Sequence, residues 1–153
     1  MFTPSILNSP NSFTPRPEII ETIFRAISEQ VDIAQAGTVN IAFLSDEEIQ
    51  ELNKNHRGID KTTDVLSFHY FEDFTDLKSE EIAGEIILSE VKIFSQAEEY
   101  GNTPEAEFTK LLIHSTLHLL GYDHEDDREY EEMHAEEQKI EKILLEKMGV
   151  AIQ

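Results

Sequence analysis

Three of the six histidines in this chain of 153 residues fall within one short stretch, at His114, His118 and His124. Because His114 and His118 are four residues apart, they lie on one face if the stretch is helical. Gly121 follows where such a helix would end, and a glycine there lets the chain turn back and bring His124 toward the other two. Three imidazoles that converge from a helix and the following turn are typical of a catalytic zinc site, which keeps a fourth position open.

The spacing H-x-x-x-H-x-x-G-x-x-H is the zinc-binding pattern of the metzincins without its glutamate. The alternative interpretation is that these are ordinary core or surface histidines. Residues 111–120 are apolar on nearly every side, which predicts a buried helix. Because buried ring nitrogens need partners, a shared metal ion explains two histidines on one buried face better than separate partners do. We therefore predict one Zn²⁺ ion per chain, bound by His114, His118 and His124.

A zinc ion with an open position favours hydrolysis of either a peptide or a phosphodiester bond. A peptidase of the H-E-x-x-H type would need a glutamate where Ser115 stands. A carboxylate at Glu85, Asp123 or Glu125 can supply the general base instead, so the peptidase hypothesis is weakened but stays open.

Phosphodiester chemistry requires cations directed at the non-bridging oxygens, and one basic segment supplies them. Residues 54–61 contain Lys54, Arg57 and Lys61 in a chain whose formal net charge is −20. The planar guanidinium of Arg57 can bind two phosphate oxygens, and the two lysines can orient a polyanion. On charge alone, a solvated loop is the simpler interpretation of this segment.

Composition predicts one globular domain over residues 1–153, with 39% hydrophobic and 29% charged residues. No apolar run reaches the length of a membrane span, and the first residues lack the features of a signal peptide. The absence of cysteine excludes thiolate ligands and fits a cytoplasmic location. The negative charge disfavours non-specific binding to nucleic acid or lipid. Residues 125–146 are especially acidic, which indicates a solvated face or, less simply, a docking surface for a basic protein.

The hydrophobic pattern predicts an α+β fold, with about four short strands in a small mixed sheet and four to five helices. In this fold the metal site lies on a buried helix and the turn after it. Strands are expected around residues 5–8, 39–43, 62–68 and 85–88. Helices are expected over residues 18–30, from the Ser45 cap to the basic segment, over 90–100, from 104 through the histidines, and from 126 or 127 onward. In the helix over 90–100, Val91, Phe94 and Ala97 are expected to face the core.

Three segments together resemble the bacterial YbeY-type endoribonucleases: residues 51–68, the short run from Gly84 to Ile87, and residues 114–124. The resemblance implies a zinc-dependent, single-strand-specific endoribonuclease of late 16S rRNA maturation and ribosome quality control. It also implies a cytoplasmic location, with ribosomal RNA and the ribosome or its proteins as partners and no membrane. By position, His114, His118 and His124 would be the metal ligands and Arg57 the catalytic or RNA-contacting residue.

Three positions depart from the family pattern, which usually has glycine at Ser115, aspartate at Glu85 and proline at His69. Ser115 would narrow the approach to the metal helix, and His69 is either an extra ligand or a surface residue. Two other functions stay open beside the ribonuclease. One is a zinc metallopeptidase, and the other is a non-catalytic, metal-stabilised factor of ribosome assembly.

Overall fold

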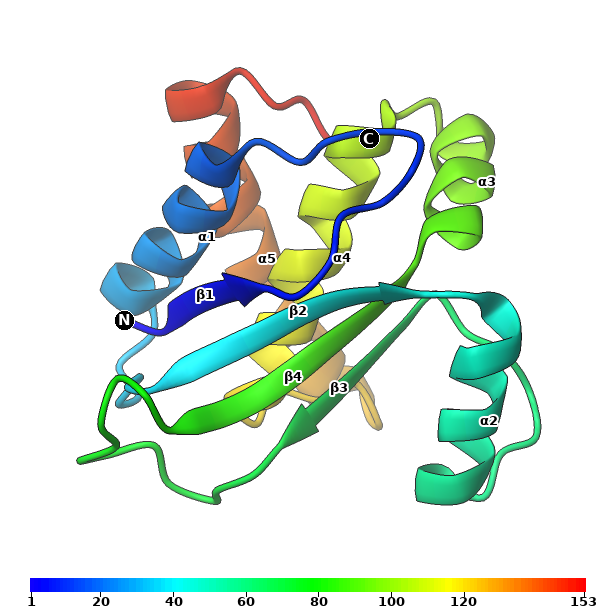
Figure 1. Ribbon diagram of the computed structural model, residues 1–153. Helices are drawn as coiled ribbons and strands as arrows, with labels where there is room; N and C mark the ends of the chain where they lie inside the picture. The colour runs from blue at the N-terminus through cyan, green and yellow to red at the C-terminus, as the bar shows by residue number, and fades with distance from the viewer.

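The computed structural model describes residues 1–153, and it confirms the α+β prediction (Figure 1). The strands are β1 (Thr3–Ile6), β2 (Thr38–Leu44), β3 (Val65–His69) and β4 (Ile82–Ser89). The helices are α1 (Pro17–Gln30), α2 (Asp46–Arg57), α3 (Glu90–Tyr100), α4 (Pro104–Leu119) and α5 (Asp127–Met148). None of these helices combines the length and the apolar character that crossing a membrane requires.

The four strands form one mixed sheet in the order β1-β2-β4-β3. β1, β2 and β4 are parallel, whereas β3 runs antiparallel to β4 and forms an edge of the sheet. Gly84 in β4 allows a close approach at this edge, because a Cβ atom there would lie 2.6 Å from the carbonyl oxygen of Phe68. The same Cβ atom would lie 3.1 Å from the side chain of Leu119, so the end of α4 packs directly on β4.

Two hydrophobic clusters of unequal size cover the two faces of the sheet. The larger one contains 28 buried residues from the sheet and from α1, α3, α4 and α5, and Figure 1 shows α1, α4 and α5 together on that side. The smaller one contains only Ile49 of α2, Leu66 of β3 and Ile87 of β4. α2 is therefore attached to the opposite face by a small apolar contact.

Side-chain caps begin the helices where the sequence indicates them. Ser45 Oγ accepts a hydrogen bond from the backbone N–H of Glu48 at 3.2 Å and donates one to its carboxylate at 3.0 Å. Thr103 Oγ1 accepts from the N–H of Ala106 at 3.1 Å, with Pro104 at the first helical position. Asp126 caps α5 in the same way. These bonds satisfy N–H groups that have no partner within the helix.

The predicted boundaries of three strands were wrong. β4 spans Ile82–Ser89 and not residues 85–88, because its pairing with β2 begins with Ile82 opposite Thr38. β1 spans Thr3–Ile6 and not residues 5–8, because Phe2 is fully buried and anchors the chain before the strand, while Leu7 is 57% exposed. Beyond the strand, the side chain of Asn8 bonds the backbone of Phe43 in place of ladder hydrogen bonds. β3 begins at Val65 and not at residue 62, because its pairing with β4 starts opposite Leu88.

Two further expectations were wrong. In α3, Ile93 and Ala97 face the core, whereas Val91 is 63% exposed and Phe94 lies at the surface against Phe13. The basic segment is not simply a loop, because its first half forms the last turn of α2. That helix ends at Gly58, whose φ of 72° is in the left-handed region that favours glycine.

Candidate metal centre and its cavity

α4 presents one open stripe to the cavity. After its first turn every residue of the helix is buried except Lys110, His114 and His118, which are four residues apart. The rest of the helix packs into the larger hydrophobic cluster, which fixes the rotation of α4 about its axis. A buried helix with a single polar stripe places these three side chains in a row, about 6 Å apart along the axis.

His124 returns to this stripe through the turn after α4. Gly121 has a φ of 97°, and the N–H of Tyr122 donates to the carbonyl of Leu117 at 3.1 Å, so the chain reverses after the helix. The ring centroid of His124 lies 5.8 Å from that of His114 and 5.2 Å from that of His118. Their potential ligand atoms all lie within 4.8 Å of one another. The predicted convergence of the three histidines is confirmed.

The donor set fits a divalent metal ion. Nδ1 of His114 lies 3.3 Å from the carboxylate of Glu137 on α5, and a hydrogen bond there leaves Nε2 free to bind a metal. Burial lowers the pKa of His118, and the neighbouring His114 and His124 lower it further. His118 is therefore kept neutral, as a metal ligand must be. Three imidazoles with an open side suit zinc-type ions better than the hard cations that prefer oxygen.

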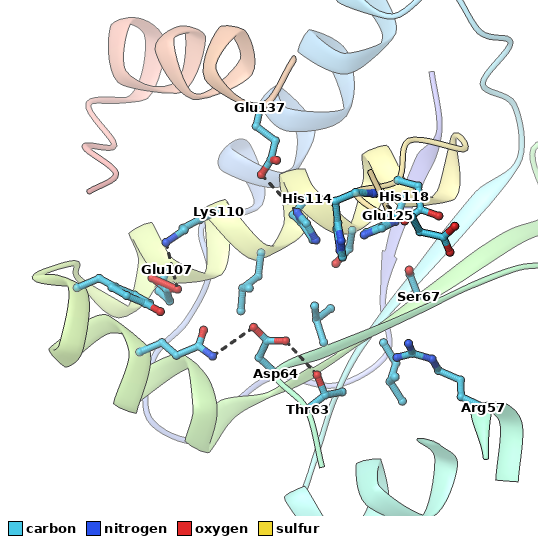
Figure 2. A pocket seen from close by; sticks show the side chains of 18 residues that line it. Arg57, Thr63, Asp64, Ser67, Glu107, Lys110, His114, His118, Glu125 and Glu137 are labelled. Atoms are coloured by element: carbon cyan, nitrogen blue, oxygen red, sulfur yellow. Dashed lines mark hydrogen bonds and ion pairs between the residues drawn. The ribbon is translucent and has the colours of Figure 1, made fainter. Parts of the chain in front are cut away.

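A cavity of about 750 Å³ lies in front of the histidines, between α4 and the segment that leads into β3 (Figure 2). This is the size of pockets that enclose small organic ligands. Its lining has only two permanently cationic side chains, Arg57 and Lys110. Five carboxylates also line it: Asp64, Glu107, Asp123, Glu125 and Glu137. An anionic substrate can enter such a cavity only where cations offset these charges.

Arg57 reaches this cavity from a distant part of the sequence. It is the last residue of α2, and Figure 2 shows its guanidinium directed from the end of that helix toward the cavity. The structure thus brings Arg57 and the three histidines to one cavity. Lys54 and Lys61, which were expected to assist it, are not among the lining residues.

The three carboxylates considered for the general base differ in whether they line the cavity. Asp123 and Glu125 line the cavity beside the histidines. Glu85 does not line the cavity. Its carboxylate accepts a hydrogen bond from the hydroxyl of Tyr70, which raises the pKa of that tyrosine to about 12. Glu85 is therefore the weakest of the three candidates for the general base.

The other two departures from the family pattern also differ in position. Ser115 is 1% exposed and lines the cavity, and its hydroxyl has no hydrogen-bond partner. His69 is an exposed residue at the end of β3, with Nδ1 3.2 Å from the carbonyl of Phe71. It does not belong to the histidine cluster, so the structure favours the surface interpretation for His69.

Several residues of the cavity were not predicted from the sequence, among them Glu137, which lies beside His114, and Lys110, one helical turn before it. Glu137 carries no signal of its own, because it lies on another helix among many acidic residues. Lys110 could have been found, since it precedes His114 by the same four residues that separate His114 from His118.

The family model and the related sequences agree on one family. The family model described as "Endoribonuclease YbeY" matches residues 11–145. The chain is 39% identical to an Endoribonuclease YbeY of Caldanaerobacter subterraneus subsp. tengcongensis, over 86% of this chain and 87% of the relative. It is 34% identical to one of Shouchella clausii, over 80% and 82%. A solution structure of a Thermotoga maritima protein matches with a TM-score of 0.58 at 30% identity, covering 94% of this chain and 91% of the other.

Proposed function

This chain belongs to the YbeY endoribonuclease family, and from this premise we propose that it is a zinc-dependent endoribonuclease specific for single-stranded RNA. We further propose that it acts in the cytoplasm, in late 16S rRNA maturation and ribosome quality control. Residues 1–153 would form one functional domain.

One observation carries the proposal: the three histidines and Arg57 line the same cavity, although Arg57 belongs to a different helix. A guanidinium can bind both non-bridging oxygens of a phosphodiester at once, whereas the carbonyl group of a peptide offers it a single oxygen. Ser115 stands where a zinc peptidase of this pattern carries its glutamate. The combination favours phosphodiester cleavage over peptide cleavage.

His114, His118 and His124 would hold the zinc ion, and Glu137 would orient His114 through the hydrogen bond at Nδ1. A bound zinc ion supplies Lewis-acid polarisation of a phosphoryl oxygen and makes an attacking oxygen more acidic. The burial that keeps His118 neutral also limits the competition between protons and the metal near pH 7.

Arg57 would bind the non-bridging oxygens of the scissile phosphate, where negative charge develops during the reaction. Asp123 or Glu125 would accept the proton of the attacking oxygen, and their position in the cavity lining supports this role.

The partners follow from charge. Because the chain has a net charge of −20, it repels free RNA electrostatically. We therefore propose that the RNA reaches the site while the chain is bound to the ribosome. The acidic side chains of residues 125–146 suit a basic ribosomal protein, which would hold the enzyme beside its substrate.

The test is metal analysis of the purified chain together with cleavage assays. We expect about one zinc per chain, zinc-dependent cleavage of a single-stranded RNA, slower cleavage of the same sequence in a duplex, and no cleavage of casein or short peptides. Removal of zinc by a chelator should abolish RNA cleavage, and added zinc should restore it.

Two outcomes would replace the proposal. Zinc-dependent peptide cleavage that disappears in His118→Ala would establish the peptidase. If the chain cleaves no RNA even with ribosomal subunits present, while its loss still impairs ribosome assembly, the chain is a non-catalytic assembly factor.

A further inference from the structure

The open stripe of α4 continues past the histidines to Lys110. Lys110 lies one helical turn before His114 and lines the same cavity. Figure 2 shows Lys110, His114 and His118 in order along α4, with Arg57 on the other side of the cavity. The cavity therefore extends well beyond the space that a metal ion and one phosphate require.

The ammonium group of Lys110 is available for a ligand. Its nearest charged partner is the carboxylate of Glu107, at 4.0 Å, which is too long for a hydrogen bond. Glu107 is 1% exposed, and Asn102 donates to its other oxygen at 2.9 Å. The facing Oε1 atom of this buried carboxylate has no hydrogen-bond partner, so its charge attracts the ammonium group, whose protons can still be donated to an incoming phosphate.

An aromatic ring adjoins this cation. The Nζ atom of Lys110 lies over one face of the ring of Tyr100, the last residue of α3, at 4.4 Å from the ring centroid, so a base would stack on the opposite face. Tyr100 lines the cavity and is 49% exposed, so much of its ring is accessible. Proteins that bind single-stranded RNA combine this kind of aromatic surface, on which a base stacks, with a cation that contacts the backbone.

We propose that Tyr100 and Lys110 form a nucleotide subsite for the residue next to the scissile phosphate of a single-stranded RNA. The base stacks on Tyr100, and Lys110 binds the neighbouring phosphate. This inference rests on the proposed ribonuclease function, and it explains how a cavity with five carboxylates orients a polyanion. A base paired in a duplex cannot reach Tyr100, so the subsite contributes to the preference for single strands.

The first experiment measures kcat/KM of the zinc-loaded chain on a single-stranded RNA of twelve nucleotides with one mapped cleavage position. Tyr100→Ala should lower kcat/KM about tenfold, as expected for the loss of one stacked base, and Tyr100→Phe should stay near the wild-type value. Tyr130→Ala is the matched control, because Tyr130 is similarly exposed but lies on α5 outside the cavity. It should have no effect.

Shortening the RNA identifies the nucleotide involved. Oligonucleotides are trimmed one residue at a time from the 5′ side or from the 3′ side of the cleavage position. On one side, removing the nucleotide next to the cleavage position should lower kcat/KM of the wild-type enzyme about as much as Tyr100→Ala lowers it on the full-length RNA. The same removal should not lower kcat/KM of the Tyr100→Ala variant any further. Equal sensitivity of wild type and Tyr100→Ala to trimming on both sides would overturn the subsite.

Lys110 is tested through the salt dependence of RNA binding. A loss of activity alone would not separate a lost phosphate contact from lower stability, because removing Lys110 leaves Glu107 without a cation nearby. Lys110→Gln should lower the slope of log affinity against log salt by about 0.7, the value for one single-strand phosphate contact. Binding is measured with zinc-loaded Arg57→Ala, in which cleavage is slowed, with and without Lys110→Gln or Tyr100→Ala. Unchanged affinity and slope in both double variants would refute the subsite.

The two proposals fail in different ways. If the wild-type chain cleaves no RNA, the ribonuclease function fails, while the binding measurements still decide whether Tyr100 and Lys110 contact RNA. If the wild-type chain cleaves RNA and Tyr100→Ala matches it in rate and binding, only the subsite fails.

Discussion

The two walls of the cavity are supported by hydrophobic clusters of very different size. The wall that carries the histidines is α4, which is packed into a cluster of 28 buried residues. The wall that carries Arg57 is the end of α2, which is attached to the sheet through Ile49 and two strand residues. Both walls contribute to one site, but the α4 wall is held by far more buried apolar contacts than the α2 wall.

This difference in support matches the positional precision that each wall would need for its role. Three nitrogen atoms must lie within tenths of an ångström of fixed positions to bind zinc, and a large core holds them there. An arginine that meets a flexible RNA strand can tolerate more movement, because its side chain is long and its fork can adjust to the phosphate. Changes on the α4 wall should therefore alter metal binding and stability, whereas changes on the α2 wall should alter the reaction rate.

The largest effect should come from removing two ligands on the α4 wall. His114→Ala with His118→Ala should lose zinc and all detectable RNA cleavage. It should also lose the stabilisation by zinc, which is about 2.7 kcal/mol at a metal concentration one hundred times the dissociation constant. Zinc content and thermal unfolding with and without zinc measure these effects.

A matched double variant controls for the loss of two histidines. His69→Ala with His134→Ala removes two exposed imidazoles outside the cluster and should keep its zinc. Full zinc occupancy in the His114 and His118 variant would show that the metal site lies elsewhere.

The second effect concerns the α2 wall. Arg57→Ala should retain zinc and folding but lose roughly 10²- to 10³-fold in RNA cleavage, the usual scale for one group that stabilises developing charge. Arg57→Lys should recover only part of the rate, because an ammonium cannot bind two oxygens in a fixed plane. Single-turnover cleavage at saturating enzyme measures the chemical step. Lys54→Ala, on the same helix but outside the cavity, is the control, and cleavage that does not respond to Arg57→Ala would remove this residue from the mechanism.

The third effect compares the two clusters directly. Leu112→Ala in α4 and Ile49→Ala in α2 each truncate a fully buried side chain. We expect a loss of about 3–5 kcal/mol for Leu112→Ala, with weaker zinc binding, because the large cluster cannot collapse around the void. For Ile49→Ala we expect about 2 kcal/mol and slower cleavage at unchanged zinc affinity. Urea unfolding and zinc titration separate these outcomes, and a loss of zinc affinity confined to Ile49→Ala would reverse the comparison.

The sequence predicts the α4 wall better than the α2 wall, for physical reasons. The histidine cluster is local, since a four-residue spacing on a helix and one left-handed glycine are enough to bring the three rings together. The position of Arg57 depends on the pairing of β3 with β4 and on the packing of α2, which local patterns do not specify. Glu137 reaches His114 only because α5 packs beside α4.

The error in α3 has a similar origin. Val91 and Phe94 share one apolar face of the helix, and Ile93 and Ala97 share another, so periodicity alone cannot select the buried face. The sheet and α4 select Ile93 and Ala97, whereas Phe94 packs at the surface against Phe13. The sequence does not show that the segment around Phe13 passes over this helix.

The smallest effect concerns Glu141 on α5, behind the histidine wall. Burial raises the pKa of Glu141, and the neighbouring Glu137 raises it further, against smaller opposing effects of Lys110 and His134. Because the folded pKa lies above the unfolded one, the folded state loses stability as the pH rises above 4.5 and through the folded pKa, where the unfolded chain ionises more readily. Glu141→Gln removes this loss, so the variant should match wild type below pH 4.5 and be the more stable of the two at neutral pH. Urea unfolding of chelator-treated protein across this range measures the difference, with Glu146→Gln, an exposed residue of the same helix, as the control for one lost charge. A stability difference that shrinks as the pH rises would show that the carboxylate of Glu141 stabilises the wall instead of straining it.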